Sequence, residues 1–492
     1  MMIDNSDFVF PEKYKPHGYQ KRAAKFLLEK ACGALLLEPG LGKTATTLSA
    51  IKTLKTKGLL QKVLIIAPLR VCYTVWPREI LKWEDFNGLK AVILHGKNKD
   101  AAVLEEADIY LINPEGLPWL MKAAQVAARN GKKKLTINTK WWQYLGFDLL
   151  VVDELSKFKH TNTNRFSLLK QVIKTFSRRW GLTGSPAANG LLDLFGQFYV
   201  LDEGNALGKY ITQYRLKYFI SDYMGYNWTL QPGADKLIYE RIRPLSLQMS
   251  ATDYLEMPEI IENFIHVDLP ADVRKFYKEL EDKYVACYQG DRVVANTAAV
   301  VCGKLRQVAC GGLYLHPDLV FNNFKPLERK REWLNLHNEK TQALEDLIDE
   351  LQGEQLLVAY EYEHDLDRLR ARFKHAVFAA DYPMTRFPEM EKAWNEGRIP
   401  LLFGHPQSIG HGLNLQQRGF HLCWHSITWN YELYTQFNDR LYRQGNKSKK
   451  VFVHHLVARD TIDNTILSML KRKEMTQNLL FSALKEDIIK KH

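Results

Sequence analysis

Short runs of apolar residues alternate with amphipathic stretches along the chain. In the first half these runs lie at 34–38, 62–68, 91–94, 108–113 and 148–154, and in the second half at 355–361, 376–380, 400–405 and 450–457. Runs of this length are typical of strands that are buried on both faces, and the stretches between them carry helical spacing. The pattern predicts an α/β fold with two parallel-sheet lobes.

The middle of the chain has a different pattern. Residues 206–335 are rich in aromatic and charged residues and contain few apolar strand runs, while Val273, Phe276, Tyr277 and Leu280 recur at helical spacing. We therefore expect a mainly helical insertion between the lobes. The expected divisions are an N-terminal tail (1–14), a first lobe (15–205), the insertion (206–335), a second lobe (336–473) and a C-terminal tail (474–492).

Composition narrows the class of protein. The 492 residues are 46% hydrophobic and 25% charged, which excludes a mainly disordered, collagen-like or coiled-coil chain. The 68 Lys and Arg residues exceed the 56 Asp and Glu residues, so the formal charge is +12. This surplus favours a polyanionic partner without identifying it.

The sequence gives no indication of a membrane protein, a secreted protein or a zinc-binding protein. The longest apolar runs are far shorter than the about 18 residues of a membrane-spanning helix, and the N-terminus lacks the basic start and apolar core of a signal peptide. The six cysteines are scattered, without a Cys-x-x-Cys pair. We expect reduced thiols, a cytoplasmic protein and no membrane partner.

Residues 37–44, Leu-Glu-Pro-Gly-Leu-Gly-Lys-Thr, stand between an apolar strand run and a helical stretch. Small residues there let backbone N–H groups surround phosphate oxygens, a lysine can reach the β- and γ-phosphates, and a hydroxyl can bind Mg²⁺. The full phosphate-loop pattern begins with glycine, and this chain has Leu37. A chance Gly-Lys-Thr is the alternative interpretation of the loop alone.

Two carboxylates and two arginines could supply the remaining groups that nucleotide hydrolysis needs. Asp153 and Glu154 end an apolar strand run, where the first can hold Mg²⁺ and the second can orient or deprotonate the attacking water. Arg440 and Arg443, spaced i and i+3, would lie on one face if this segment is helical, and they would supply positive charge near the γ-phosphate. Because the arginines belong to the second lobe, hydrolysis would depend on closure of the lobes. Exposed surface charges are the alternative for the arginines alone.

The order of these motifs resembles the superfamily 2 helicases, and within them the Swi/Snf-like branch of double-stranded-DNA translocases. The resemblance rests on segments that follow one another from about residue 15 to 473. They are 17–20 (HGYQ), 38–44 (EPGLGKT), 63–83, 151–160 (VVDELSKFKH), 182–189 (LTGSPAAN), 304–316, 408–416 (SIGHGLNLQ), 436–445 (QFNDRLYRQG) and 451–473. It implies two RecA-like lobes and a compact motor of bacterial or viral type, in a bacterial cell or in the cytoplasm of an infected host cell.

The resemblance also assigns roles to residues. Gln20 would recognise adenine, and the catalytic residues would be Lys43, Glu154, Arg440 and Arg443. The implied ATP-binding positions are Gln20, Gly40, Gly42, Lys43, Thr44, position 45 (Ala45), Asp153 and Gly412, with Thr44 and Asp153 on Mg²⁺. The implied nucleic-acid contacts are Pro68, Arg70, Asn113, Gly116, Thr183, Ser408 and Asn414.

The chain departs from the family pattern at two places. Leu155 and Ser156 stand where relatives have Ala-His, which puts the coupling between nucleotide and DNA in question. Arg243 is followed by Pro244 where many relatives have a basic pair. In addition, the basic segment 129–134 lies near Trp141 and Trp142, which fits either a nucleic-acid surface or an exposed loop beside core tryptophans.

The sequence thus predicts a monomeric, ATP- and Mg²⁺-dependent motor on DNA, which we expect to be duplex and to be bound with little sequence specificity. A strand-separating superfamily 2 DNA or RNA helicase is the nearest alternative. A nucleic-acid-binding scaffold with a vestigial ATPase is the alternative from another class of protein.

Overall fold

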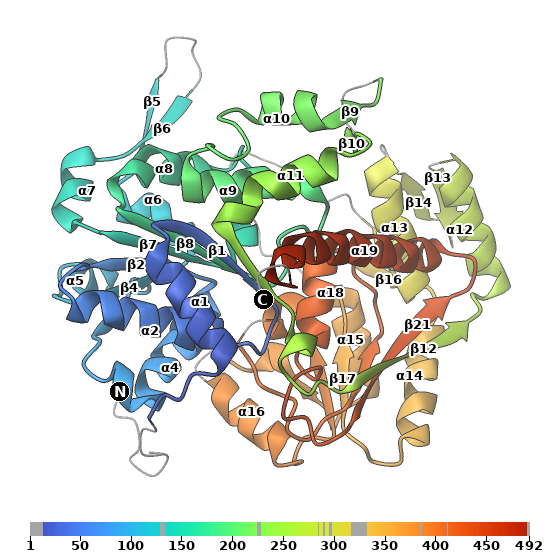
Figure 1. Cartoon of the computed structure of the whole chain (residues 1–492). Coiled ribbons are helices and arrows are strands. Elements are labelled where there is room, and N and C mark those ends of the chain that lie inside the picture. The colour runs from blue at the N-terminus through green and yellow to red at the C-terminus, as the bar shows by residue number, and fades with distance from the viewer. Residues whose placement is uncertain are drawn as a thin grey trace. The chain divides into compact units, whose positions relative to one another are not determined.

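A computed structural model describes residues 13–127, 133–223, 228–283, 285–288, 291–294, 298–315, 332–383, 386–410 and 412–489. The chain divides into two compact units. Unit 1 runs to Leu255 and also includes the chain from Lys473 onward, and unit 2 runs from Glu256 to Arg472. Figure 1 shows the elements of both units, coloured along the chain.

Unit 1 is built on a parallel sheet. Among the described residues the strand order is β11 (Ser246–Met249), β1 (Cys32–Leu37), β8 (Arg178–Thr183), β7 (Leu149–Asp153), β2 (Val63–Ile66), β4 (Ile109–Ile112) and β3 (Ala91–Ile93). All neighbouring pairs are parallel. The central strands β2, β4 and β7 are buried along their whole length, as their unbroken apolar runs predict.

Helices follow most of these strands along the chain. They are α1 (Gly18–Glu29), α2 (Lys43–Thr56), α3 (Leu69–Thr74), α4 (Trp76–Lys82), α5 (Lys99–Ala102), α6 (Leu117–Leu120), α7 (Thr139–Leu145), α8 (Asn164–Val172), α9 (Leu194–Asp202), α10 (Ile211–Tyr218) and α11 (Ala234–Ile242). Two hairpins accompany them, β5 (Ala124–Ala127) with β6 (Lys133–Thr136) and β9 (Phe219–Ser221) with β10 (Trp228–Leu230). Apolar side chains of sheet and helices form one core cluster.

The parallel arrangement fixes where a ligand can bind. The carboxyl ends of all these strands lie at one edge of the sheet, where ligands bind in open α/β folds. β1 and β2 end at Leu37 and Ile66, and β4, β7 and β8 end at Ile112, Asp153 and Thr183. The ends of these strands and the segments after them carry the unit 1 residues that the sequence predicts to contact nucleotide or nucleic acid, except Gln20.

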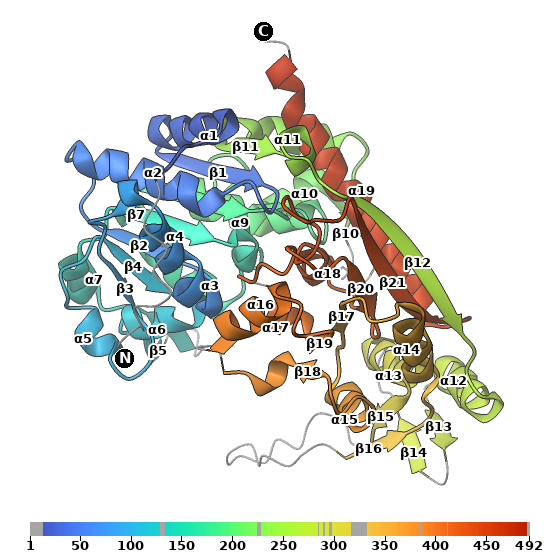
Figure 2. The ribbon, with the colours of Figure 1, turned by 90° about the horizontal axis from the view of Figure 1, so that it is seen from below.

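Unit 2 contains a second parallel sheet. Its strand order among the described residues is β12 (Glu259–Val267), β21 (Lys450–Ala458), β20 (His421–Trp424), β17 (Leu356–Ala359), β19 (Leu401–Gly404) and β18 (Val377–Phe378), with every neighbouring pair parallel. Figure 2 shows β12 beside β21 at the edge of this sheet. The predicted class, an α/β protein with two parallel-sheet lobes, is confirmed.

The helices of unit 2 are α12 (Ala271–Lys283), α13 (Ala298–Cys310), α14 (Glu339–Glu350), α15 (Glu363–Arg372), α16 (Phe387–Asn395), α17 (Pro406–Ile409), α18 (Tyr431–Asn438) and the start of α19 (Ile462–Ile489). Its hairpins are β13 (Val285–Tyr288) with β14 (Asp291–Val294) and β15 (Gly312–Tyr314) with β16 (Trp333–Asn335). A buried ion pair joins two of the helices, because Lys340 Nζ of α14 lies 2.7 Å from Asp463 Oδ2 of α19. Both side chains are almost fully buried.

The compact units divide the chain differently from the expected domain boundaries. Residues 206–335 were expected to form one insertion and do include helices α10 to α13. The boundary between the two units falls after Leu255, so α10 and α11 belong to unit 1, and α12 and α13 belong to unit 2. β11 joins the sheet of unit 1 beside β1, and β12 joins the sheet of unit 2 beside β21. Up to Ile489, the residues expected as a C-terminal tail form the second part of α19, whose Leu480, Phe481 and Leu484 are buried in the core cluster of unit 1.

Within the described part of the chain, no helix combines the length and the apolar character needed to cross a bilayer.

Candidate active site

The loop between β1 and α2 has the backbone geometry of a phosphate-binding loop. Gly40 and Gly42 have φ angles of 90° and 72°, a left-handed conformation that glycine adopts without steric cost. Gly42 is the N-cap of α2, so the helix begins at Lys43. The first N–H groups of α2 therefore face the end of the loop, where they and the helix dipole can bind an anion.

Lys43 folds back over this loop. Its Nζ donates a hydrogen bond to the Leu37 carbonyl at 2.7 Å, and the Glu38 carbonyl oxygen lies at 3.5 Å. The amine is thus held at the first residues of the loop, Leu37 and Glu38. Thr44 is half-buried in the first turn of α2. Ala45 is buried and has no polar side-chain group, so only its backbone N–H can serve a ligand.

Gln20 lies against the same loop, although it is 21 residues away in the sequence from the carbonyl that it contacts. Its Oε1 accepts a hydrogen bond from the backbone N–H of His17 at 2.9 Å, and its Nε2 donates to the Leu41 carbonyl at 3.4 Å. The side chain is 8% exposed. The structure therefore brings the predicted adenine-recognising residue and the loop together.

Asp153 ends β7 near Lys43. The carboxyl is buried, and burial raises its pKa, while a hydrogen bond from Trp76 and the positive charge of Lys43 act in the opposite direction. Trp76 Nε1 donates to Asp153 Oδ2 at 2.9 Å. Trp76 is not among the residues predicted from the sequence, because nothing in an apolar helical stretch marks one indole as a polar contact.

Glu154 has an unusual backbone conformation. Its φ of 59° and ψ of 64° are left-handed, which costs free energy for a residue with a side chain. It forms the N-cap of the short 3₁₀ helix η4 (Leu155–Phe158). The backbone therefore changes from extended at Asp153 to left-handed at Glu154.

Pro68 and Arg70 follow β2, and Asn113 and Gly116 follow β4, so the structure brings them to the carboxyl edge of the unit 1 sheet. Pro68 is the N-cap of α3, and Asn113 Nδ2 donates to Glu115 Oε2 at 2.9 Å. Partial burial lowers the pKa of Arg70 to about 10.

Thr183 fits the nucleic-acid assignment less well. It is fully buried at the end of β8, and its hydroxyl accepts a hydrogen bond from the Ser185 N–H at 3.1 Å. In this structure its side chain is not accessible to a nucleic acid.

In unit 2 the structure brings the two predicted arginines to one loop. Nη1 of Arg440 donates to the Leu413 carbonyl at 2.8 Å, and Nη1 of Arg443 donates to Asn414 Oδ1 at 2.7 Å and lies 3.5 Å from the same carbonyl. Arg440 is 4% exposed. Desolvation lowers the pKa of Arg443.

The two arginines do not lie in a helix, so the condition for a shared helical face is not met. α18 ends at Asn438, and the chain continues in turns, since the N–H groups of Arg440 and Leu441 bond to carbonyls three residues back. Both arginines nevertheless converge on the loop 412–414. Gly412 in this loop has a φ of 75°, and Ser408 lies in the short helix α17 that precedes it.

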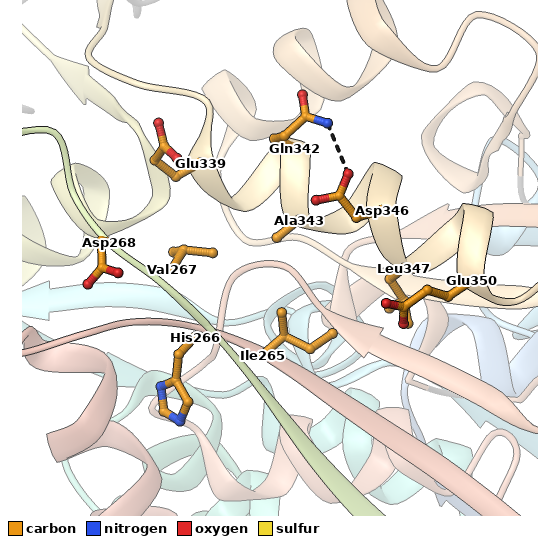
Figure 3. A pocket seen from close by; sticks show the side chains of 10 residues that line it. All are labelled: Ile265, His266, Val267, Asp268, Glu339, Gln342, Ala343, Asp346, Leu347 and Glu350. Carbon is orange, nitrogen blue, oxygen red and sulfur yellow. Dashed lines mark hydrogen bonds between the residues drawn. The ribbon is translucent and has the colours of Figure 1, made fainter.

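Figure 3 shows a pocket of unit 2 between the end of β12 and α14. Its volume is about 440 Å³, and its lining includes Asp268, Glu339, Asp346 and Glu350. It lies beside edge strand β12, whereas the loop with Ser408 and Asn414 follows β19, and β21, β20 and β17 lie between these two strands. A lining of carboxylates repels phosphate groups, so this pocket is not part of the candidate site.

Of the basic segment beside Trp141 and Trp142, residues 129–132 lie outside the described part of the chain. Trp142 is a core residue whose Nε1 donates to Thr175 Oγ1 at 3.0 Å. Trp141 is partly buried, and the Lys122 ammonium lies 3.6 Å from its ring centre.

A family model described as "SNF2-related domain" matches residues 19–311. "Putative protein p41" of Acyrthosiphon pisum secondary endosymbiont phage 1 is 31% identical over 489 residues, which cover 96% of this chain and 99% of that protein. "Uncharacterized ATP-dependent helicase YqhH" of Bacillus subtilis is 20% identical, with 94% of this chain and 79% of that protein covered.

Longer eukaryotic proteins match as well. "CHD3-type chromatin-remodeling factor PICKLE" of Arabidopsis thaliana is 24% identical over 95% of this chain, and the match spans about a third, 34%, of that protein. Among solved structures, "Sulfolobus solfataricus SWI2/SNF2 ATPase core in complex with dsDNA" is similar with a TM-score of 0.41 and 20% identity, over 96% of each chain.

Proposed function

The chain belongs to the SNF2-related family, and from this premise we propose that it is an ATP-dependent motor that moves along duplex DNA. The observation that carries the proposal is the geometry of the loop before α2: Gly40 and Gly42 are left-handed, Gly42 caps the helix, and the Lys43 amine bonds back to the Leu37 carbonyl. Membership of the family makes the chain a helicase-like, nucleic-acid-stimulated ATPase.

The residues present fit ATP and Mg²⁺. The donor set comprises the loop N–H groups, Lys43 for the β- and γ-phosphates, the Thr44 hydroxyl and the Asp153 carboxylate. Mg²⁺ is commonly held by one or two protein oxygens and the phosphates, which is what this set supplies. When bound, Mg²⁺ neutralises charge that develops on the phosphates.

In the proposed mechanism Gln20 recognises the adenine ring, and the loop with Lys43 orients the triphosphate. Glu154 orients the attacking water and accepts its proton. Arg440 and Arg443 of unit 2 complete the charge stabilisation when the units close on the nucleotide. Such arginines are typically worth 10³–10⁵ in turnover.

For the nucleic acid we propose a track along the carboxyl edges of both sheets. In unit 1 it includes Pro68, Arg70, Asn113 and Gly116, and in unit 2 Ser408 and Asn414. These residues lie in turns and short helices after strands, where side-chain and backbone donors can meet phosphates. Phosphate contacts carry little sequence information, so binding is weakly sequence-specific and depends strongly on salt. We further propose a monomer that acts in the cytoplasm of a bacterial or infected cell.

The direct test is ATPase turnover with duplex DNA, single-stranded DNA and RNA at two salt concentrations, together with Lys43→Ala as the inactive control. We expect the strongest stimulation by duplex DNA and a marked loss at the higher salt concentration. A preference for RNA, or strand separation in an unwinding assay, would replace the duplex translocase by the helicase alternative. Nucleic-acid binding without hydrolysis on any polymer would favour the scaffold.

A further inference from the structure

The hydrogen bond from Trp76 to Asp153 joins two residues that are 77 positions apart in the sequence and are both buried. We propose that Trp76 is a positioning residue, which holds the Asp153 carboxylate in the orientation that binds hydrated Mg²⁺ beside the phosphate loop. This inference rests on the proposed function, and it names a residue that acts through Asp153 without touching the nucleotide.

The fold explains why the indole reaches the carboxylate. β2 and β7 are neighbouring parallel strands with Ile66 opposite Val152, so the segments that follow them start side by side. After β2 the chain forms α3 and then α4, whose first residue is Trp76. Pro77 at the start of α4 fixes the backbone there, and the Trp76 ring is fully buried.

Indole is chemically suited to this position. Its Nε1–H is a donor only, so it can neither bind a metal ion nor accept a proton from the attacking water. A carboxylate offers about four lone-pair sites, and one donor on Oδ2 restricts its rotation while leaving further acceptor capacity. The nearby Cys72 thiol does not replace it, since its Sγ donates to the Ala67 carbonyl at 3.5 Å.

The same indole connects the site to the proposed nucleic-acid track. Arg70 lies on α3, and α3 and α4 meet at Val75, which caps both helices. The donor to Asp153 therefore stands on the helix that directly follows the one with Arg70. Groups that orient metal ligands typically contribute 10- to 100-fold to metal affinity or activity.

The test uses Trp76→Phe, which keeps an aromatic ring and removes the donor, and measures the affinity for a fluorescent ATP analogue with Mg²⁺ and with EDTA. We expect affinity about 10-fold weaker than wild type in Mg²⁺ and unchanged in EDTA. Trp180→Phe is the matched control, because Trp180 is also fully buried in unit 1 and its Nε1 donates to the Lys30 carbonyl at 3.2 Å. The control should retain the Mg²⁺-dependent affinity even if it melts at a lower temperature.

If Trp76 only stabilises the fold, Trp76→Phe should lower the affinity for the ATP analogue equally in Mg²⁺ and in EDTA, or should change the affinity in Mg²⁺ no more than Trp180→Phe does. Either outcome overturns the inference. If Trp76→Phe does not fold, 3-benzothienylalanine at position 76 removes the N–H at constant ring size, with the same expected and contradicting results. In an Asp153→Asn background, Trp76→Phe should cause no further loss in Mg²⁺; a full additional loss would also overturn it. If the wild-type protein shows no Mg²⁺-dependent binding of nucleotide, the proposed function fails first.

Discussion

Two features of the structure require glycine at position 42, where the loop ends and α2 begins. Its φ of 72° is unfavourable for any other residue, and a Cβ there would lie 2.4 Å from Gln20 Nε2. Gly42→Ala should therefore cost about 1 kcal/mol for the backbone and, in addition, displace Gln20 from the loop. We expect nucleotide affinity to fall by about 10-fold, a loss of about 1.4 kcal/mol.

Gly58→Ala is the control for this change. Gly58 has a nearly identical φ of 69°, and nothing lies within 4 Å of the Cβ position. Thermal melting and nucleotide titration of both variants separate backbone strain from the contact with Gln20. Equal nucleotide affinities of the two variants would mean that the contact between Gln20 and the loop is not needed.

Arg443 tests the role of unit 2 in hydrolysis. Arg443→Ala should leave nucleotide binding nearly intact and reduce DNA-stimulated turnover by about 10³ or more, because it removes transition-state charge stabilisation. Arg459→Ala removes an exposed arginine of the same unit, paired with Asp268 at 2.9 Å, and should have little effect. Wild-type turnover of Arg443→Ala would remove the closure mechanism.

At the scale of elements, strands β12, β20 and β21 share a chain of hydrogen-bonded polar side chains, in which His421 and His454 are buried and Asn263 is exposed. Asn263 Nδ2 donates to His454 Nδ1 at 3.1 Å, and His454 Nε2 lies 3.1 Å from His421 Nδ1. An amide nitrogen only donates, so a neutral His454 carries its proton on Nε2 and donates it to His421. Burial lowers the pKa values of His421 and His454 to about 4.

The lowered pKa values of His421 and His454 predict that unit 2 is destabilised by acid. Between about pH 6.5, the ordinary histidine pKa, and about pH 4, the unfolded state binds more protons than the folded state. The stability that depends on neutral histidines is thus complete above about pH 6.5 and is lost as the pH falls toward 4. Melting temperatures measured from pH 7.5 to 5 should fall steeply, and less steeply in His421→Gln. Exposed His375→Gln is the control, and a slope unchanged by His421→Gln would contradict the assignment.

The strands that the sequence predicts are those with unbroken apolar runs, such as β2, β7 and β19. β8 and β12 were missed for physical reasons: β8 begins with two arginines and contains glycine, and most positions of edge strand β12 are exposed or half-buried. β11 contains Ser246 and Gln248, and β20 begins with His421, so neither is an unbroken apolar run. Tertiary pairing in the sheet, rather than local pattern, makes these segments strands.

In the candidate site, too, features that are local in the sequence could be predicted, and contacts that depend on tertiary structure could not. Glycine spacing and strand-end carboxylates are local in the sequence, so the loop, Lys43 and Asp153 could be predicted. The contact from Trp76 to Asp153 and the convergence of Arg440 and Arg443 on the loop after α17 depend on which strands are neighbours. Their partners are 77 and about 30 residues away, beyond the reach of local spacing.

At the scale of the whole molecule, α19 belongs to both units, because it begins in unit 2 and ends in the core cluster of unit 1. Truncation after Glu474 removes Leu480, Phe481 and Leu484, and each such buried side chain contributes about 1.5–3 kcal/mol. We expect a loss of about 5 kcal/mol or more from unit 1, which is a large share of typical domain stability.

Truncation after Ile489 is the matched control, since it removes only the last three residues of the chain. Denaturant unfolding followed by tryptophan fluorescence should show a destabilised protein for the long truncation alone. Equal stabilities of the two truncated proteins would mean that the end of α19 is not needed in the core of unit 1.

Directed movement along duplex DNA is tested most directly by displacement of a third strand from a triplex. A labelled oligonucleotide bound in the major groove of a long duplex should be released by the protein with ATP and Mg²⁺, and not with Lys43→Ala or a non-hydrolysable ATP analogue. The duplex itself should remain paired. Rapid ATP hydrolysis on the same DNA without release of the third strand would contradict the account.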